Sequence, residues 1–331
     1  MSIEAQVSIF TSALKSQFVT LFEETAEPMA FEQFTERIPS TARIEHYPWM
    51  SPVPGVSLWT GHRRYGKLTT SIYSVENKEF SSEFEVLLRD VEDDQVSGYM
   101  RKPKELAVRA KKFPGRWVIK HLAAAKTRTC FDGSYFVANS HTLGTGDNLL
   151  AYTTADASSG SATSAVVYKL AFLYSGDALK PLLYQDRKPP KFMTNAGTPQ
   201  SFENKILRYW IDMEGEAAYG WWWDAVWVDI TGFPLVTEMH SIFAAVEGAF
   251  RTFQYPKADD GDDGEYIHEQ EEFSGSNLVA VGSTALAEVL RQAVNQDWVP
   301  QAIGGTPSGV APTTNRFKSW CNVLVSAFMN P

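Results

Sequence analysis

The sequence predicts a mixed α+β protein, and three observations lead to this class. First, apolar residues recur every three or four positions over 3–24 and over 96–126, which is the spacing of amphipathic helices. Second, residues 67–88 alternate loosely between apolar and polar side chains, as strands do. Third, the stretch 217–230 is apolar on both alternating faces, which is typical of a strand covered on both sides. With 331 residues the chain can form one large domain or two ordinary ones.

Composition and charge argue against several classes of function. The formal net charge of −9 opposes a protein whose whole surface binds nucleic acid, because such binding neutralises phosphates with Lys and Arg. Two cysteines, Cys130 and Cys321, are too few for a disulfide framework and fit a reducing compartment. No apolar run approaches the roughly 20 residues needed to span a bilayer, and the first residues lack the pattern of a secretory signal. We therefore expect a protein made and kept in a cytoplasm-like space.

The first predicted element is an amphipathic helix over residues 3–24. Its apolar stripe consists of Ile3, Val7, Phe10, Leu14, Phe18 and Leu21. Such a stripe docks either on the core of its own chain or on a neighbouring copy, and the spacing leaves both alternatives open. Prolines and a glycine then interrupt residues 39–62, which indicates loops and sheet edges.

A hairpin and a long helical region come next. Residues 67–88 predict a hairpin around a polar turn at Glu76-Asn77-Lys78, with few residues apolar enough to form a core alone. The acidic break at 89–94 places negative charge at a helix N-terminus, where the helix dipole favours it. Pro114 then either kinks the following helix or begins a second one that ends at about residue 126.

The second half alternates strands and helices. A stretch rich in Gly, Ser and Thr over 143–164 indicates a loop or domain boundary. The tryptophans within 217–230 favour a core or an interface over an exposed stacking platform, which would need aromatics on one face only. The other predicted elements are strands at 166–174, 182–185, 278–282 and 321–325, and helices at 237–253 and 283–295.

The candidate catalytic and metal-binding residues form no established motif. The acidic loop from Asp259 to Glu265 fails the EF-hand spacing because a glycine falls at a ligand position, so we expect a solvated loop, with loose calcium binding as the alternative. Cys130 and His141 are residue types of a thiol protease, but no family signature surrounds the cysteine. Neither paired metal-ligand histidines nor glycine-rich nucleotide loops occur. We predict no catalytic residue, no cofactor and no metal ligand.

Six segments in this order resemble the Mu-like prophage major head subunit family, the T protein of Mu-type tailed phages. The resemblance extends from about residue 40 to the C-terminal end and is weaker over the first 40 residues. Where family members tend to carry proline after the histidine, His141 is followed by Thr142. The six segments are Ser74 to Phe80, Arg89 to Asp94, Cys130 to Gly133 with Phe136, Gln185 to Pro189, Ala218 to Trp222, and Thr313 to Asn315.

The resemblance implies a major capsid protein with the Hong Kong 97-type fold. That fold has an N-terminal arm, an extended hairpin loop, a peripheral domain with a spine helix, and an axial domain. In this chain it implies an arm at 1–39, the extended loop at 40–93, the peripheral domain with its spine helix at 94–164, a mainly axial region at 165–300 and a return to the peripheral domain at 301–331.

The function implied by the resemblance is assembly of a phage head. Copies of the chain would form the hexamers and pentamers of an icosahedral shell that encloses double-stranded DNA, bound without sequence specificity. Scaffold, portal and decoration proteins would be further partners, with no membrane involved. Such a shell is assembled in the bacterial host cytoplasm and becomes part of the virion.

On this template we expect assembly contacts from the first helix, a basic cluster and the acidic break, because opposite charges on two copies give specificity and register. These residues are Phe10, Leu14, Phe18, Arg63, Arg64, Lys67, Arg89, Asp90, Glu92, Asp93 and Asp94. Three alternatives remain: an encapsulin-like cellular compartment on the same fold, a soluble cysteine hydrolase, and a tail or baseplate protein.

Overall fold

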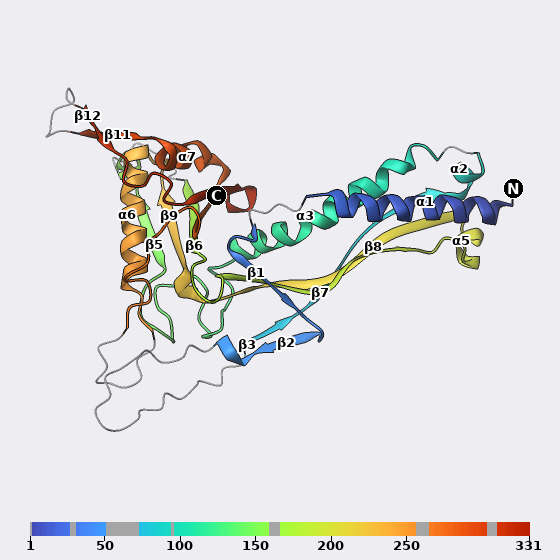
Figure 1. Cartoon of the computed structure of the whole chain (residues 1–331), viewed down its shortest axis with the longest axis horizontal. Helices are drawn as coiled ribbons and strands as arrows, with labels where there is room; N and C mark the ends of the chain where they lie inside the picture. Colours follow the sequence, from blue (N-terminus) through green and yellow to red (C-terminus); the bar gives the residue numbers. More distant parts are fainter. Residues whose placement is uncertain are drawn as a thin grey trace, which may run out of the picture.

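A computed structural model describes residues 2–26, 31–50, 73–93, 96–158, 166–255, 265–302 and 310–331. The molecule has two parts (Figure 1). One part is built on a five-stranded sheet, and the other is elongated, with two long helices lying along a four-stranded sheet. The N-terminal end lies at the far tip of the elongated part. In the described part of the chain, no helix is both long and apolar enough to cross a membrane.

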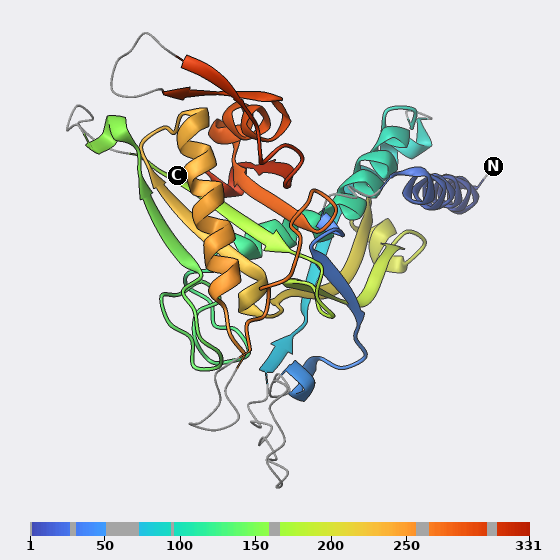
Figure 2. The same ribbon diagram turned by 60° about the vertical axis from the view of Figure 1, so that its left-hand side comes forward.

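The five-stranded sheet has the order β13-β10-β6-β9-β5. Its inner pairs are antiparallel, and the two outer pairs, β13 with β10 and β5 with β9, are parallel. Helices α6 and α7 pack against each other and against this sheet, with α6 lying across the front of it in Figure 2. The bounds are β5 Leu149–Thr153, β6 Val167–Tyr174, β9 Ala225–Thr231, β10 Leu278–Ser283, β13 Asn322–Ser326, α6 Val236–Thr252 and α7 Ala287–Asn295.

The four-stranded sheet has the order β1-β7-β8-β4. Helices α1 (Ile3–Glu24) and α3 (Lys102–Leu122) cover one of its faces. Their apolar stripes form a separate core cluster with the inward side chains of β4 and β8, such as Val86 and Ile211. The strands are β1 Thr35–Pro39, β4 Lys78–Leu87, β7 Leu182–Thr194 and β8 Ile206–Tyr219.

Pro114 lies inside α3, which is one helix, so the alternative of a second helix starting there is wrong. The predicted strand at 217–230 is also divided. Strand β8 ends at Tyr219, a short turn follows, and β9 begins at Ala225 in the other sheet. A Cβ at Gly220 would collide with the carbonyl oxygen of Lys180, so the chain needs glycine at this corner.

The predicted hairpin around Glu76-Asn77-Lys78 is wrong. Strand β3 (Tyr73–Glu76) pairs with β2 (Ile44–Tyr47), whereas β4 pairs with β8, so Asn77 joins two strands that do not pair with each other. Alternation identifies strands but not their partners, which explains the error. The ribbon of β2 and β3 is the base of a longer loop whose residues 51–72 lie outside the described part.

The last strand lies in the five-stranded sheet, where residues 322–326 form β13 beside β10. Strands β7 and β8 belong to the four-stranded sheet. The remaining elements are η2 Pro48–Met50, α2 Leu88–Glu92, η3 Tyr99–Arg101, α4 Ala155–Ser158, α5 Pro199–Glu203, η4 Trp222–Asp224, η5 Thr284–Leu286, β11 Trp298–Ala302, β12 Val310–Thr314 and η6 Ala327–Met329.

Candidate functional site

The apolar stripe of α1 is docked on its own chain. Phe10 packs edge-on against Tyr209 with ring centroids 6.1 Å apart, and Phe18 lies 5.3 Å from the ring of Phe192. Leu14 between them is fully buried. Of the two alternatives for this helix, the structure shows docking on the chain's own core, where these three side chains are buried.

The acidic break forms the short helix α2 and its C-terminal end. Its apolar residues join the core under α1, while Asp90 accepts a hydrogen bond of 2.6 Å from the Tyr99 hydroxyl. Arg89, Glu92 and Asp93 are exposed. These three are therefore the members of the expected interface set whose side chains are on the described surface.

Other expected residues lie outside the described part of the chain. They are the basic cluster Arg63, Arg64 and Lys67, together with Asp94 and the acidic loop from Asp259 to Gly264. The charges of these segments can still be read from the sequence. Residues 51–72 contain these three basic residues and no Asp or Glu.

A polar neck, formed by Ser40, Asn77 and Ala42, holds the two ends of the loop that starts with β2 and returns with β3. The buried Asn77 amide donates to the Ser40 hydroxyl at 2.7 Å and to the Ala42 carbonyl at 2.9 Å. Next to the neck, the Arg43 guanidinium bonds to Glu76 at 2.8 and 3.0 Å. From the sequence, Asn77 was predicted to be the turn residue of a hairpin. A polar triplet between two strands looks the same whether the strands pair with each other or with different partners.

Two buried carboxylates on β8 link this strand to neighbouring elements of the elongated part. Glu214 is paired with Arg187 and with Lys188, and these cations hold the pKa of its carboxyl below the usual value, Lys188 having the larger effect. Glu216 accepts a 2.7 Å bond from the Trp117 indole of α3 and pairs with Lys78 of β4. Glu216 thus links the sheet to α3, and Glu214 links β8 to β7.

Helices α1 and α3 lie on one face of the four-stranded sheet, and over the described residues no long helix covers the other face (Figure 1). Along β4, side chains alternate between the helix-covered face and an exposed row. This acidic row consists of Glu79, Ser81, Glu83, Glu85 and Leu87. A groove of about 820 Å³ lies beside it, lined in part by Lys188, Pro189 and Pro190, where the register of β7 shifts. Glu85 is paired with Arg208 of β8 at 2.8 Å, so Glu79 and Glu83 are the carboxylates of this row that can receive a basic segment.

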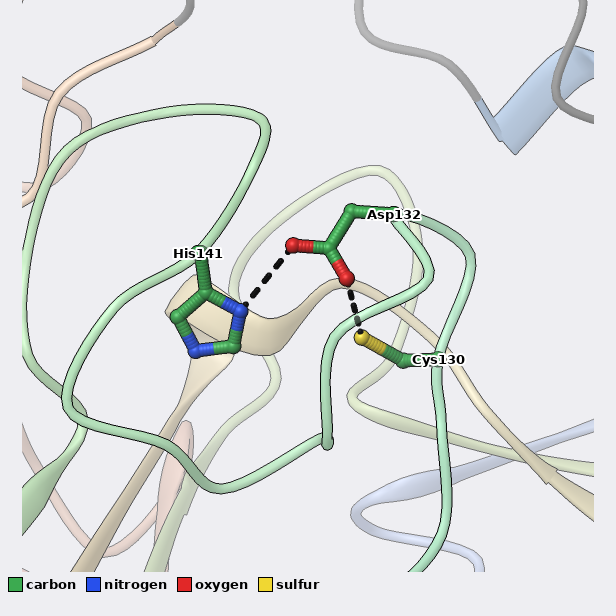
Figure 3. A group of neighbouring side chains, drawn as sticks. All are labelled: Cys130, Asp132 and His141. Carbon is green, nitrogen blue, oxygen red and sulfur yellow. Dashed lines mark hydrogen bonds and ion pairs between the residues drawn. The ribbon is translucent and has the colours of Figure 1, made fainter.

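Cys130, Asp132 and His141 form the most compact cluster of reactive residue types (Figure 3). The Cys130 thiol donates to Asp132 Oδ1 at 3.0 Å, and His141 Nδ1 lies 3.1 Å from Asp132 Oδ2. The backbone N–H groups of Ser134 and Thr142 also donate to this carboxylate. Asp132 is thus saturated with hydrogen bonds.

This arrangement does not fit a thiol hydrolase. In such enzymes the imidazole stands between nucleophile and carboxylate and takes the proton, whereas here the carboxylate stands between thiol and imidazole. Burial, and then the neighbouring Asp132, raise the pKa of the Cys130 thiol, which keeps it protonated. His141 is stacked on Trp222, with centroids 3.9 Å apart. The cluster is therefore a structural turn.

Comparisons with known proteins agree with one another. The family model for the Mu-like prophage major head subunit gpT matches residues 7–231. The Mu-like prophage FluMu major head subunit of Haemophilus influenzae is 28% identical over 200 residues, covering 59% of this chain and 64% of that protein. The major capsid protein of Escherichia phage Mu is 26% identical over 206 residues, covering 60% and 66%. The matches thus span just under two thirds of the length of these relatives.

Similarity in three dimensions extends further. The capsid of bacteriophage JBD30 superimposes with a TM-score of 0.67 and 19% identity, covering 92% of each chain. At this identity the likeness shows the fold, which is the Hong Kong 97-type capsid fold expected from the sequence.

Proposed function

The chain belongs to the Mu-like prophage major head subunit family, and from this premise we propose that copies of it assemble into the shell of a phage head. The family is one of structural subunits rather than enzymes. In our proposal the subunits form hexamers and pentamers of an icosahedral shell around double-stranded DNA, assembled in the bacterial cytoplasm together with scaffold, portal and decoration proteins.

The observation that carries the proposal is a pair of segments of opposite charge, one on strand β4 and one in the sequence between β2 and β3. The acidic row of β4 is exposed on the uncovered sheet face, and the loop that leaves from β2 and β3 is basic at residues 51–72. We propose that the loop of one subunit lies on the acidic row of the next. A contact between two different surfaces is head-to-tail, and it closes into a ring when the rotation permits.

The parts of the described fold can then be matched to the parts of a Hong Kong 97-type capsid subunit. We propose that α3 with the four-stranded sheet is the peripheral domain, that the five-stranded sheet with α6 and α7 is the axial domain, and that residues 44–76 are the extended loop. The expected arm at 1–39 includes β1, a strand of the four-stranded sheet. Its mobile part in assembly would therefore be limited to α1.

A charge-swap experiment tests the proposed contact. The variant Arg63→Glu, Arg64→Glu, Lys67→Glu should elute from gel filtration as small species and show no shells by electron microscopy, because like charges now face each other. Adding Glu79→Lys and Glu83→Lys to the same chain should restore shells. Lys15→Glu, an exposed change on α1, is the matched control and should assemble normally. Normal shells from the triple variant would rule out this contact.

The rival functions have no observation in their favour. The hydrolase requires a thiol beside an imidazole, which the Cys130 cluster does not provide. An encapsulin-like compartment shares the fold, but the family match is to phage head subunits.

A further inference from the structure

A second cluster of metal-ligating side chains lies where the two sheets meet. Asp177 follows β6, Asp224 is the last residue of the turn that precedes β9, and His268 lies between α6 and β10. One donor atom from each side chain lies within 4.8 Å of the other two. Three segments far apart in the sequence thus bring an imidazole and two carboxylates to one point.

The polar atoms of this cluster lack the partners that buried groups normally have. Asp224 and His268 are completely buried. Neither carboxylate oxygen of Asp224 has a hydrogen-bond partner in the described structure, nor does His268 Nδ1 or Asp177 Oδ2. His268 Nε2 lies 3.4 Å from Asp224 Oδ1, and its N–H group bonds instead to the Trp223 carbonyl oxygen at 3.1 Å. The contrast with the saturated Asp132 is clear.

A buried carboxylate without donors requires a positive charge or a proton, because its desolvation is costly. No described Lys or Arg is paired with the three side chains. The nearby Glu271 adds negative charge and accepts a 2.7 Å bond from the Tyr174 hydroxyl, whose ring contacts His268. The surroundings therefore favour any cation that can enter.

We propose that Asp177, Asp224 and His268 form a binding site for one divalent metal ion, with Zn²⁺ as the best match. Ligand atoms that bind Zn²⁺ at about 2.0–2.2 Å in a tetrahedral shell lie about 3.3 Å apart. His268 Nε2 lies 3.4 Å from Asp224 Oδ1, close to this value, and to bind the ion it would give up the proton that it now donates to the Trp223 carbonyl oxygen.

The donor set favours Zn²⁺ over the harder cations. Mg²⁺ and Ca²⁺ prefer six or more oxygen ligands, often including water, whereas imidazole with few carboxylates suits Zn²⁺. Asp177 is half-buried, so the ion has an entry path on its side. A bound ion would join the end of β6, the turn before β9 and the segment before β10, which stabilises the junction between the two sheets.

Metal analysis of the whole purified chain tests the site. Without chelators during purification, mass spectrometry should find about one Zn²⁺ per chain. EDTA should remove it and lower the melting temperature, and added Zn²⁺ should restore it, with Mn²⁺ weaker and Mg²⁺ and Ca²⁺ without effect. Asp224→Asn and His268→Gln should each weaken Zn²⁺ binding by more than about 100-fold. Asp177→Asn, at the half-buried position, provides a third variant that perturbs the core least.

Two outcomes would overturn the site. The first is a chain without bound metal whose melting temperature responds to neither EDTA nor Zn²⁺; in that case Asp224 is protonated, and Asp224→Asn should melt at the same temperature or higher. The second is loss of all binding when Asp259, Asp260, Asp262 and Asp263 are changed to Asn, since that variant leaves the proposed ligands intact. Retention of Zn²⁺ by this control supports the site.

Discussion

The side chain of Asp132 determines what its neighbours can do. Because its two oxygens bond to Cys130 and His141, the thiol and the imidazole are kept apart and neither is free for catalysis. The sequence predicted the absence of a protease from the lack of a signature, and the structure adds the physical reason. The sequence did not reveal the role of Asp132, since a hydrogen-bonded turn aspartate and a surface aspartate look alike in sequence.

Replacing Asp132 by Asn should destabilise the fold. The amide has nearly the same shape but presents an NH₂ group to donors that now bond to a carboxylate, which leaves buried groups unpaired. We expect a loss of about 1–3 kcal/mol in the free energy of unfolding, measured by urea denaturation of the unassembled chain. Asp147→Asn, an exposed neighbour, should change it by less than about 0.5 kcal/mol. Equal effects of the two changes would contradict the role of Asp132.

His121 should make the folded chain sensitive to mild acid. Burial, then the charges of Arg128 and Lys78, lower the pKa of its imidazole to about 3. The unfolded chain binds a proton near pH 6.5, which the folded chain does not bind until about pH 3, so stability is lost as the pH falls between these values. From pH 6.5 to 5 the loss is roughly 2 kcal/mol.

The variant His121→Gln removes this titration. Its unfolding free energy should depend less on pH between 7 and 5 than that of the original chain, by about that amount. The nearby Glu216, whose carboxylate oxygen is 3.9 Å from His121 Nδ1, opposes the effect but is already paired with Lys78. His46→Gln, at an exposed position, should leave the pH dependence as it is. An identical slope for His121→Gln would show that the imidazole has the same pKa in the folded and the unfolded chain.

At the scale of elements, the sequence predicted what forms but not what pairs. The bounds of α1, α6 and β10 agree with their expectations within one residue, because each has a strong apolar period and clear ends. The predicted pairing of β3 with β4 was wrong, because pairing depends on contacts with residues far away in the sequence, such as Ile44 and Met213. The prediction of interface residues has the same limit. The sequence shows that Phe10 and Phe18 lie on one apolar stripe, but not which surface covers that stripe.

Docking of α1 on its own chain can be measured through Phe18. This side chain is buried between the rings of Phe22 and Phe192. The change Phe18→Ala should weaken the packing of α1 on its own chain by about 3–5 kcal/mol. Hydrogen exchange over residues 3–24 should then be faster, while α6 keeps its protection. The exposed Val19→Ala should leave exchange unchanged. Unchanged protection in Phe18→Ala would show that α1 is held by other contacts.

At the scale of the molecule, the described part of the fold leaves one face of the four-stranded sheet without a covering helix and places acidic side chains on it, while basic residues occur in the sequence 51–72. The sequence contained both signals, in the basic residues of 51–72 and in the acidic residues Glu79, Glu83 and Glu85. Only the strand register shows that these three carboxylates share one face. A contact between charged surfaces exposed to water is weakened by salt, whereas burial of apolar surface is not.

Assembly should therefore depend on ionic strength in a way that follows the charges. For the original chain, the yield of shells at fixed protein concentration should fall as NaCl rises from about 0.05 M to about 1 M, where the screening length drops to about 3 Å. The variant Arg63→Gln, Arg64→Gln, Lys67→Gln lacks the basic partner, so its lower yield should hardly change with salt. Light scattering during assembly provides the measurement, with Lys15→Gln as a control that keeps the full salt dependence. If yields of the original chain rise with salt and the neutral variant behaves identically, apolar contacts dominate and the charged surfaces do not drive assembly.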